Sequence, residues 1–140
     1  MQELSLRKNV DEIGFKVAAM MFENALTKLP QTEIETANYF SDGTYVRVTK
    51  LPKEHCITGG VHKKDHICVV IGHVVVIDES GENTYNGVHV FNSPAGVKRV
   101  LRTIDNTLFM TIHGTDLKDI AAIEDELFSD SYASYDEAMK

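Results

Sequence analysis

Three side chains that could bind a metal ion stand together in "GGVHKKDHICVVIGH": His62, Asp65 and His66. A spacing of four would aim both histidines at one ion if the segment were a helix. Gly59-Gly60 come before it and a β-type run follows, so we expect an extended segment, in which residues four apart share a face. Asp65 then faces away from His66, and only one of the two points inward unless a bulge intervenes. The alternative is a pair of surface histidines flanking the start of a strand.

Basic side chains indicate a second kind of chemistry. Lys98 and Arg99 follow the turn "SPAG", and an arginine there can hold a carboxylate or phosphate through two parallel hydrogen bonds. Tyr45 and Arg47 alternate along an earlier segment and are predicted to line the same cavity. These four residues form our candidate site for a small anionic ligand. The structural alternative for Arg99 is a salt bridge with Asp65 or Glu82.

Composition limits the class of protein. The chain has 140 residues and a net charge of −7, which suits a single soluble domain (1–140) and argues against a nucleic-acid partner. Charges throughout the first 17 residues do not fit a signal peptide, and no apolar run has the roughly 20 residues of a membrane span. Two cysteines without CxxC spacing do not make a disulfide framework. We therefore expect a cytoplasmic protein that does not act at a membrane.

Two helices are predicted, one on each side of a β region. Residues 10–29 form the first, with Asn9 or Asp11 near its start and Pro30 just past its end. Its apolar residues cover more than one face, which fits either a helix wedged between barrel and loop or one that also meets a second subunit. Residues 116–128 form a second, amphipathic helix, and the polar tail 129–140 is predicted to fray or dock loosely.

The region between the helices, residues 39–113, is mainly β. Short Val- and Ile-rich runs alternate with turn signals, which favours an antiparallel sandwich or barrel over βαβ units. Within it, "HICVVIGHVVVID" is predicted to form two strands hinged at Gly72. The pair Asn86-Gly87 suits a type I′ hairpin turn.

The order of these segments resembles a known family. "GGVHKKDHICVVIGHVVV", then "FNSPAGVKRVL", then "TLFMTIHGTDLKDIAAIEDEL" are similar to the small cupin-like proteins encoded by bacteriophages and prophages. The resemblance covers roughly residues 14–128. It implies a cupin-type jelly-roll β-barrel with an N-terminal and a C-terminal helix, and it implies no particular reaction.

The usual cupin metal ligands are only partly matched. Asp65 stands seven residues before Gly72, where an acidic ligand would be, and Arg99 occupies a position that is usually histidine. A jelly roll brings distant strands together, so His113, at the end of "FMTIH", is expected to approach His62 and His66. Three imidazoles with open positions suit Zn²⁺, Fe²⁺, Mn²⁺ or Ni²⁺. The alternative for His113 is a ring that caps the following turn.

Three functions remain open. The first is a phage-type cupin that binds a divalent metal or a small anionic ligand inside the barrel. The second is a non-catalytic binding or assembly protein, either a virion accessory or a modulator of a host protein in the host cytoplasm. The third is a metal-dependent isomerase, lyase or dioxygenase. For each we expect a homo-oligomer, with the multi-faced helix 10–29 as the interface, and a further protein partner is compatible with the second.

Overall fold

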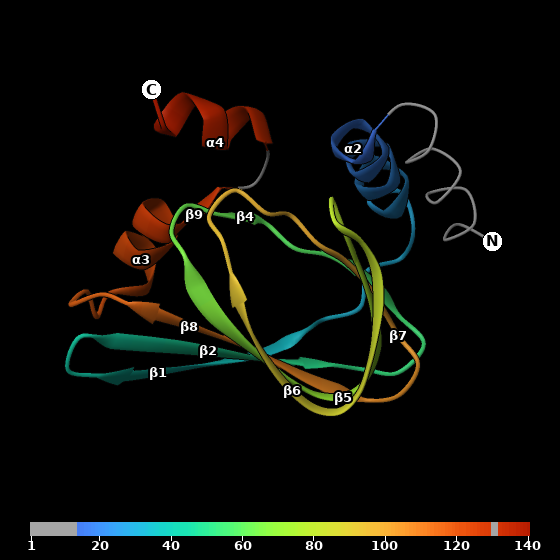
Figure 1. Cartoon of the computed structure of the whole chain (residues 1–140), viewed down its shortest axis with the longest axis horizontal. Coiled ribbons are helices and arrows are strands. Elements are labelled where there is room, and N and C mark those ends of the chain that lie inside the picture. Colours follow the sequence, from blue (N-terminus) through green and yellow to red (C-terminus); the bar gives the residue numbers. More distant parts are fainter. Residues whose placement is uncertain (1–13, 130–131) are drawn as a thin grey trace.

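The fold is a curled antiparallel sheet with its helices gathered at one end (Figure 1). It is seen in a computed structural model, which describes residues 14–129 and 132–140. The sheet follows the order β1-β2-β8-β5-β7-β3, and β6 pairs with β5 outside this path. A separate two-stranded sheet pairs β4 with β9. The strands of the described residues are β1 (Glu35–Ser41), β2 (Thr44–Leu51), β3 (Cys56–Thr58), β4 (Val61–His62), β5 (His66–Asp78), β6 (Gly81–Ser93), β7 (Val100–Thr103), β8 (Thr107–Gly114) and β9 (Phe128–Ser129).

The predicted pair of strands hinged at Gly72 is one continuous strand, β5, that changes its partner at the glycine. Residues 67–71 pair with β8, whereas residues 74–77 pair with β7. The turn between β7 and β8 crosses at this point, so that a Cβ on Gly72 would lie 2.5 Å from Thr107 Oγ1 and 2.6 Å from the Asn106 carbonyl oxygen. Hydrogen bonding to β6 along the whole length of β5 keeps the strand continuous through the bend.

The hairpin predicted at Asn86-Gly87 is wrong. Both residues lie inside β6, where Gly87 is paired with Gly72, and the chain reverses instead between Asp78 and Gly81. The Asp78 side chain supports that turn by accepting a hydrogen bond from the Ser80 backbone N–H at 2.9 Å. The permissive backbone of Gly87, at φ 96°, serves to bend β6 alongside β5.

The N-terminal helix, α2 (Phe15–Leu26), packs one face against the outside of the barrel. Phe15, Ala18, Ala19 and Phe22 contact the second half of β5 and the start of β7. The predicted range of 10–29 was too long at its end, because Thr27 and Gln31 side chains satisfy the last carbonyl groups of the helix. Its predicted start, including Asn9 and Asp11, lies outside the described residues.

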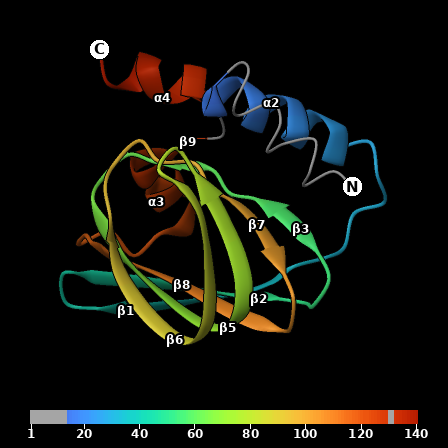
Figure 2. The same cartoon turned by 45° about the vertical axis from the view of Figure 1, so that its right-hand side comes forward.

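The C-terminal region holds two helices, α3 (Ile120–Leu127) and α4 (Tyr132–Ala138). The helix predicted at 116–128 is shorter, because Asp119 caps it by accepting from the Ala122 N–H at 3.0 Å and Phe128 enters β9. The tail predicted to fray or dock loosely contains α4. Tyr135 lies over Gly96, where a Cβ would be 3.1 Å from the tyrosine oxygen, and this contact docks α4 on the barrel. Figure 2 shows α2 and α4 at the same end of the barrel.

Among the described helices, none has the length and apolar character that crossing a membrane requires.

The close approach at Gly72 generates a stability prediction. We expect Gly72→Ala to lower the free energy of unfolding by about 1–3 kcal/mol, because a methyl group there overlaps backbone and side-chain atoms of residues 106–107. Urea denaturation followed by circular dichroism measures it. Gly59→Ala is the matched control, since a Cβ at Gly59 meets nothing nearer than 3.9 Å. Equal stability of the two variants would contradict the view that the bend of β5 requires a residue without a side chain at position 72.

Candidate metal centre

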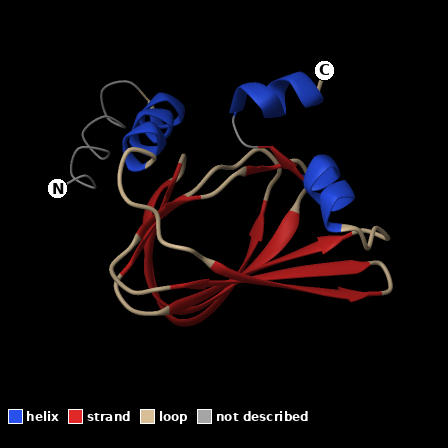
Figure 3. Ribbon diagram, turned by 180° about the vertical axis from the view of Figure 1, so that it is seen from behind, coloured by secondary structure: helices blue, strands red, loops and turns tan. Residues whose placement is uncertain are grey.

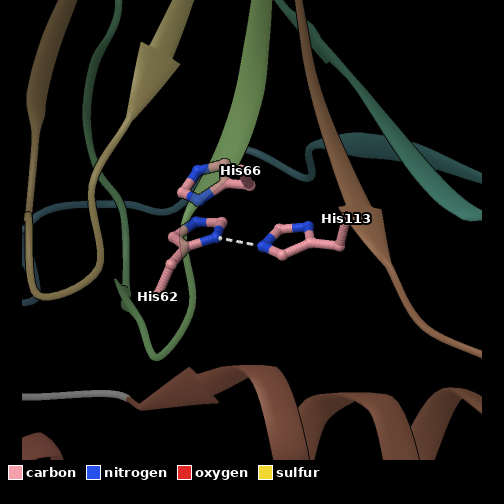
Figure 4. A group of neighbouring side chains, drawn as sticks. All are labelled: His62, His66 and His113. Carbon is pink, nitrogen blue, oxygen red and sulfur yellow. Dashed lines mark hydrogen bonds between the residues drawn. The ribbon is translucent and has the colours of Figure 1, made fainter.

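Three histidines meet at the helix-covered end of the barrel (Figure 4). Each offers one ring nitrogen, and these three nitrogens lie within 4.8 Å of one another. His66 and His113 are buried and His62 is partly buried. The three rings lie almost parallel, with interplanar angles of 5–16° and centroid separations of 4.1–5.1 Å.

The fold brings the rings together from three strands. His62 ends β4 and His66 begins β5, and the bend at residues 63–65 between them separates the two strands. The two histidines therefore converge across a turn, and not along one extended strand as the spacing had suggested. His113 arrives on β8, which pairs with the first half of β5. The predicted convergence of His113 on His62 and His66 is thus what the structure shows.

Hydrogen bonds assign the proton on His66. Its Nδ1 lies 3.0 Å from the Lys64 carbonyl oxygen, which can only accept, so Nδ1 carries the hydrogen. The other nitrogen, Nε2, is buried and has no hydrogen-bond partner in the structure. His62 Nδ1 and His113 Nε2 face one another at 3.0 Å. A carbonyl that fixes one nitrogen while the other stays free is the arrangement found around metal-binding histidines.

Burial keeps all three imidazoles neutral. Burial, together with the neighbouring rings of His66 and His113, lowers the pKa of His62 to about 2. Burial likewise lowers the pKa of His113 to about 4 and lowers the pKa of His66. A neutral imidazole is the form that binds a metal ion, so the site presents lone pairs at neutral pH.

The cluster opens into a cavity of about 270 Å³ inside the barrel. Basic, acidic and hydroxyl side chains share its wall with apolar ones. Cys68 also lines it, but burial raises the pKa of this thiol to about 11, so it is protonated at neutral pH. The charged and polar lining residues besides the histidines are Arg47, Thr49, Arg99, Thr111, Glu124 and Ser129.

Arg47 lines the cavity and is held by contacts with three other side chains. Its Nε donates to the Tyr45 hydroxyl at 2.8 Å, and its Nη2 lies 3.2 Å from Glu124 Oε1. Its guanidinium also covers the ring of Phe128, 4.5 Å from the centroid. Tyr45 was predicted to line the cavity but is fully buried beside it, where its hydroxyl bonds Asn38 and holds Arg47 in place.

Arg99 lines the cavity as predicted and is held from several sides. Its Nη1 donates to Ser93 Oγ at 2.8 Å, and its Nε lies 3.5 Å from Asp78 Oδ2. Its charge also lies over Phe91, 5.3 Å from the ring centroid. The side chain therefore presents a fixed positive charge to the cavity, with Asp78 partly balancing it.

Two candidate residues lie away from the site. Lys98 is 1% exposed and points out of the barrel, where its Nζ pairs with Glu23 of α2 at 2.9 Å and donates to the Gly59 carbonyl oxygen. It fastens α2 to the barrel and is not among the cavity residues. Asp65 is exposed, and its Oδ1 accepts from the Ala95 N–H at 2.8 Å. Of these two competing residues, His66 is therefore the one that points inward, because the Asp65 side chain supports the Pro94-Ala95 turn.

Sequence reasoning missed several members of the site. Glu124 comes from α3 in the acidic "IEDEL" segment, which served only as a family signature. Phe128 meets the rings of His62 and His113 edge-on, with centroids 4.7 and 5.5 Å apart. Thr111 precedes His113 by two on the same face of β8, and its buried hydroxyl has no partner. The alternation of "TIH" could have identified Thr111, whereas nothing local marks Phe128.

Comparison with known proteins identifies the architecture. No protein-family model and no curated protein sequence matches the chain. Solved structures do match, among them a cupin superfamily protein from Desulfitobacterium hafniense with a TM-score of 0.50 and 12% identity, covering 66% of this chain and 86% of that one. The chain has the cupin fold. A protein from Neisseria meningitidis (TM-score 0.50, 14% identity, 66% and 95% covered) and one from Photorhabdus luminescens (0.52, 8%, 62% and 79%) are similar as well. At these identities the likeness is one of fold alone.

The cupin barrel confirms the predicted fold class, a mainly β jelly roll with few helices. The strands of its main sheet lie between Glu35 and Gly114, and the predicted β region was 39–113.

The buried imidazoles predict how the stability of the metal-free protein depends on pH. Unfolded histidine has a pKa near 6.5, and the folded values for His62 and His113 are lower, so the unfolded chain takes up protons first as the pH falls. Their contribution is complete above pH 6.5 and is lost as the pH falls toward the folded pKa, about 4 for His113 and about 2 for His62. We expect chelator-treated protein to lose on the order of 2 kcal/mol of unfolding free energy for each of these two histidines between pH 7.5 and pH 5.

Urea titrations at the two pH values measure this loss. The double variant His62→Asn/His113→Asn cannot titrate at these positions and should show a smaller difference between pH 7.5 and pH 5. An equal difference in both proteins would contradict neutral burial of the histidines.

Proposed function

We propose that this cupin-fold protein binds a divalent transition metal, Zn²⁺, Fe²⁺, Mn²⁺ or Ni²⁺, through His62, His66 and His113. The observation that carries the proposal is the free, buried Nε2 of His66, held in place by the Lys64 carbonyl beside two further neutral imidazoles. A buried nitrogen without a partner is costly unless something occupies it. The donor set fits these ions, because imidazole is the nitrogen ligand that they share.

The distances are compatible with such an ion. Metal–nitrogen bonds of about 2.1 Å place neighbouring ligand nitrogens roughly 3.0–3.4 Å apart in octahedral or tetrahedral sites. The His62 and His113 nitrogens are already 3.0 Å apart, and all three candidate atoms lie within 4.8 Å. Small side-chain rotations would therefore bring the third ring into range. With three protein ligands, the bound metal would act as a Lewis acid toward a molecule in its remaining positions.

We further propose that a small anion, a carboxylate or phosphate, occupies the cavity next to the metal. Arg47 and Arg99 both line it, and an arginine binds such groups through paired hydrogen bonds. Glu124, the partner of Arg47, has a side chain that is 59% exposed, so an incoming carboxylate can take its place at little cost. Asp78 is only 15% exposed and stays with Arg99, whose part is to fix the orientation of the anion through its charge.

Within this proposal the protein is a phage-type cupin that acts in the host cytoplasm, a placement supported by the sequence resemblance and the acidic composition. The metal site is compatible with an isomerase, lyase or dioxygenase, but the structure assigns no reacting group. A non-catalytic role in binding or assembly, as a virion accessory or a modulator of a host protein, is favoured by a different observation: a large exposed apolar surface, described in the next subsection.

Metal content tests the first part of the proposal. We expect about one equivalent of a transition metal per chain in protein purified without chelator, measured by elemental mass spectrometry. His62→Ala and His113→Ala should each lose most of it, because two ligands do not hold such an ion tightly. His89→Ala is the matched control, as His89 lies on β6 and bonds the Asn86 carbonyl oxygen outside the cluster. A wild-type protein that binds none of the four metals, even after incubation with each, would refute the site.

Calorimetry with oxalate and inorganic phosphate tests the anion. For metal-loaded protein we expect Arg47→Met to weaken binding of one of these probes about tenfold, the effect of losing one charge-assisted hydrogen bond. Lys50→Met is the control, because Lys50 is on the opposite side of β2 and pairs with Glu35. Equal dissociation constants for wild type and Arg47→Met would count against Arg47 as an anion-binding residue.

A further inference from the structure

The outer side of the main sheet carries an extended apolar face. Residues paired directly across an antiparallel sheet point to the same side, so the strand register defines which side chains share that face. Across β1, β2, β8, β5 and β6 the register gives three parallel rows. The rows are Tyr39-Val46-Ile112-Ile67-Asn92, Ala37-Val48-Met110-Val69-Val90 and Glu35-Lys50-Leu108-Ile71-Val88. We call these fifteen positions the outer face.

All but three positions of the outer face are apolar, and the three exceptions stand at its margin. Glu35 and Lys50 occupy one corner, where they pair with each other at 3.4 Å, and Asn92 occupies another. Several apolar side chains are strongly exposed: Val88 is 67% exposed, Val90 65% and Tyr39 59%. The middle of the face therefore contains no charge.

The opposite side of the same strands faces the barrel interior, where polar residues are mixed with part of the apolar core. Arg47, Thr49, Thr111 and His113 alternate with the apolar residues of β2 and β8 and point into the cavity or toward α3. Antiparallel sheets that face water on one side usually place polar residues outward. Here the inward side chains already supply both the site and the apolar core, so a requirement of the barrel core does not explain the apolar residues of the outer face.

No helix of the described residues covers this face. The helix α2 packs on Val75, Ile77 and Val100, in the other half of the barrel, and α3 packs on the cavity side of β2 against Tyr45. Figures 1 and 3 show the layer of β1, β2 and β8 from two opposite directions, with the helices on one side of it and no described element on the other.

We propose that the outer face binds a second copy of this chain in a two-fold symmetric dimer. Five strands about 4.8 Å apart and three side-chain positions about 6.8 Å apart give a patch of roughly 24 by 20 Å, on the order of 500 Å². This is near the upper limit for exposed apolar patches on monomers, about 300–600 Å². With its polar margin the face approaches the ~800 Å² that each partner contributes to a stable interface.

The charge distribution selects a second copy as the occupant. The chain carries a net charge of −7, so two copies repel each other over most of their surface. The outer face is the region where this repulsion is smallest, because its centre is uncharged and its corner holds one acid and one base. A two-fold interface uses the same patch on both subunits, and a patch with balanced charge is self-complementary. Docking on an anionic membrane would instead need a basic margin, and Lys50 is already paired with Glu35.

This dimer differs from one built on α2. The exposed apolar residues of that helix are Val17, Met20 and Met21, which form a much smaller surface. It also does not rest on the proposed metal, because the histidines lie on the other side of the sheet.

Size-exclusion chromatography with light scattering, at about 10–100 μM protein, tests the proposal. We expect the wild type to have twice the chain mass of 15.6 kDa. The double variant Val88→Lys/Val90→Lys should have the mass of a single chain, because it places four buried cations in the two-fold interface. Tyr39→Lys, at the opposite edge of the face, should weaken the dimer independently. These side chains are exposed in the single chain, so its far-UV circular dichroism should not change.

Met20→Lys/Met21→Lys is the matched control, since it adds the same charge to exposed apolar residues of α2. We expect this variant to remain a dimer. A wild type with the mass of one chain would overturn the proposal, as would a dimer that survives both outer-face variants. Dissociation by the α2 variant alone would assign the interface to the helix. A single-chain mass combined with full metal content would refute the dimer and leave the metal proposal standing.

Discussion

The contact between Gly72 and the turn at residues 106–107 is the constraint on which the rest of the structure depends. Because a bare backbone at Gly72 lets Thr107 approach, β5 can exchange one partner strand for another without interruption. The first half of β5 then carries His66 and Cys68 into the cavity, whereas the second half packs beneath α2. The metal site and the surface on which α2 packs therefore lie at opposite ends of one bent strand. A side chain at this position would separate β7 from β8 and alter both.

The bend also explains why the two halves of β5 differ in what covers their outer side. Next to the first half of β5, the sheet turns hydroxyl, imidazole and guanidinium groups inward beside part of the apolar core, and the side chains on its outer side are mostly apolar as well. Next to the second half, α2 supplies Phe15, Ala18 and Phe22 to bury the outward side chains. The same strand therefore has a helix as its outer partner in one half and, in the other, an apolar surface that no described helix covers. Oligomer formation would give the first half the cover that α2 gives the second.

The sequence predicted the architecture well where the pattern was local and repeated. Alternating Val and Ile with closely spaced turns indicated an antiparallel barrel, and the paired strands of the sheet are antiparallel. It failed at Asn86-Gly87, where a strong turn signal lies inside a long strand because Gly87 faces Gly72 across the sheet. That pairing joins residues of two strands, so the local turn propensity of Asn86-Gly87 does not predict it. The family resemblance, with its jelly-roll topology, is what placed His113 near His62.

The charged residues of the site were harder to assign because their partners come from distant elements. Lys98 and Arg99 are adjacent in sequence, yet alternation sends one out to Glu23 and the other into the cavity. Only the position of α2 reveals that the outward lysine has a carboxylate to meet. Glu124 likewise becomes part of the cavity because α3 closes over β2, a contact between residues 77 apart in sequence. The alternation of polar and apolar residues predicts which side of a strand a residue faces. It does not predict which residues of other elements lie opposite that side chain.

The electrostatics of the cavity link the metal to the anion. Arg47 and Arg99 add to burial in lowering the pKa of His62, so the arrangement that keeps the imidazoles neutral is itself positively charged. A divalent ion placed at the three rings would meet the same positive field, and Glu124 and Asp78 would compensate only the two arginines. The three neutral ligands contribute no charge to offset the ion. An anion in the remaining positions of the metal would supply that charge, so each of the two proposed ligands would make the cavity more favourable for the other.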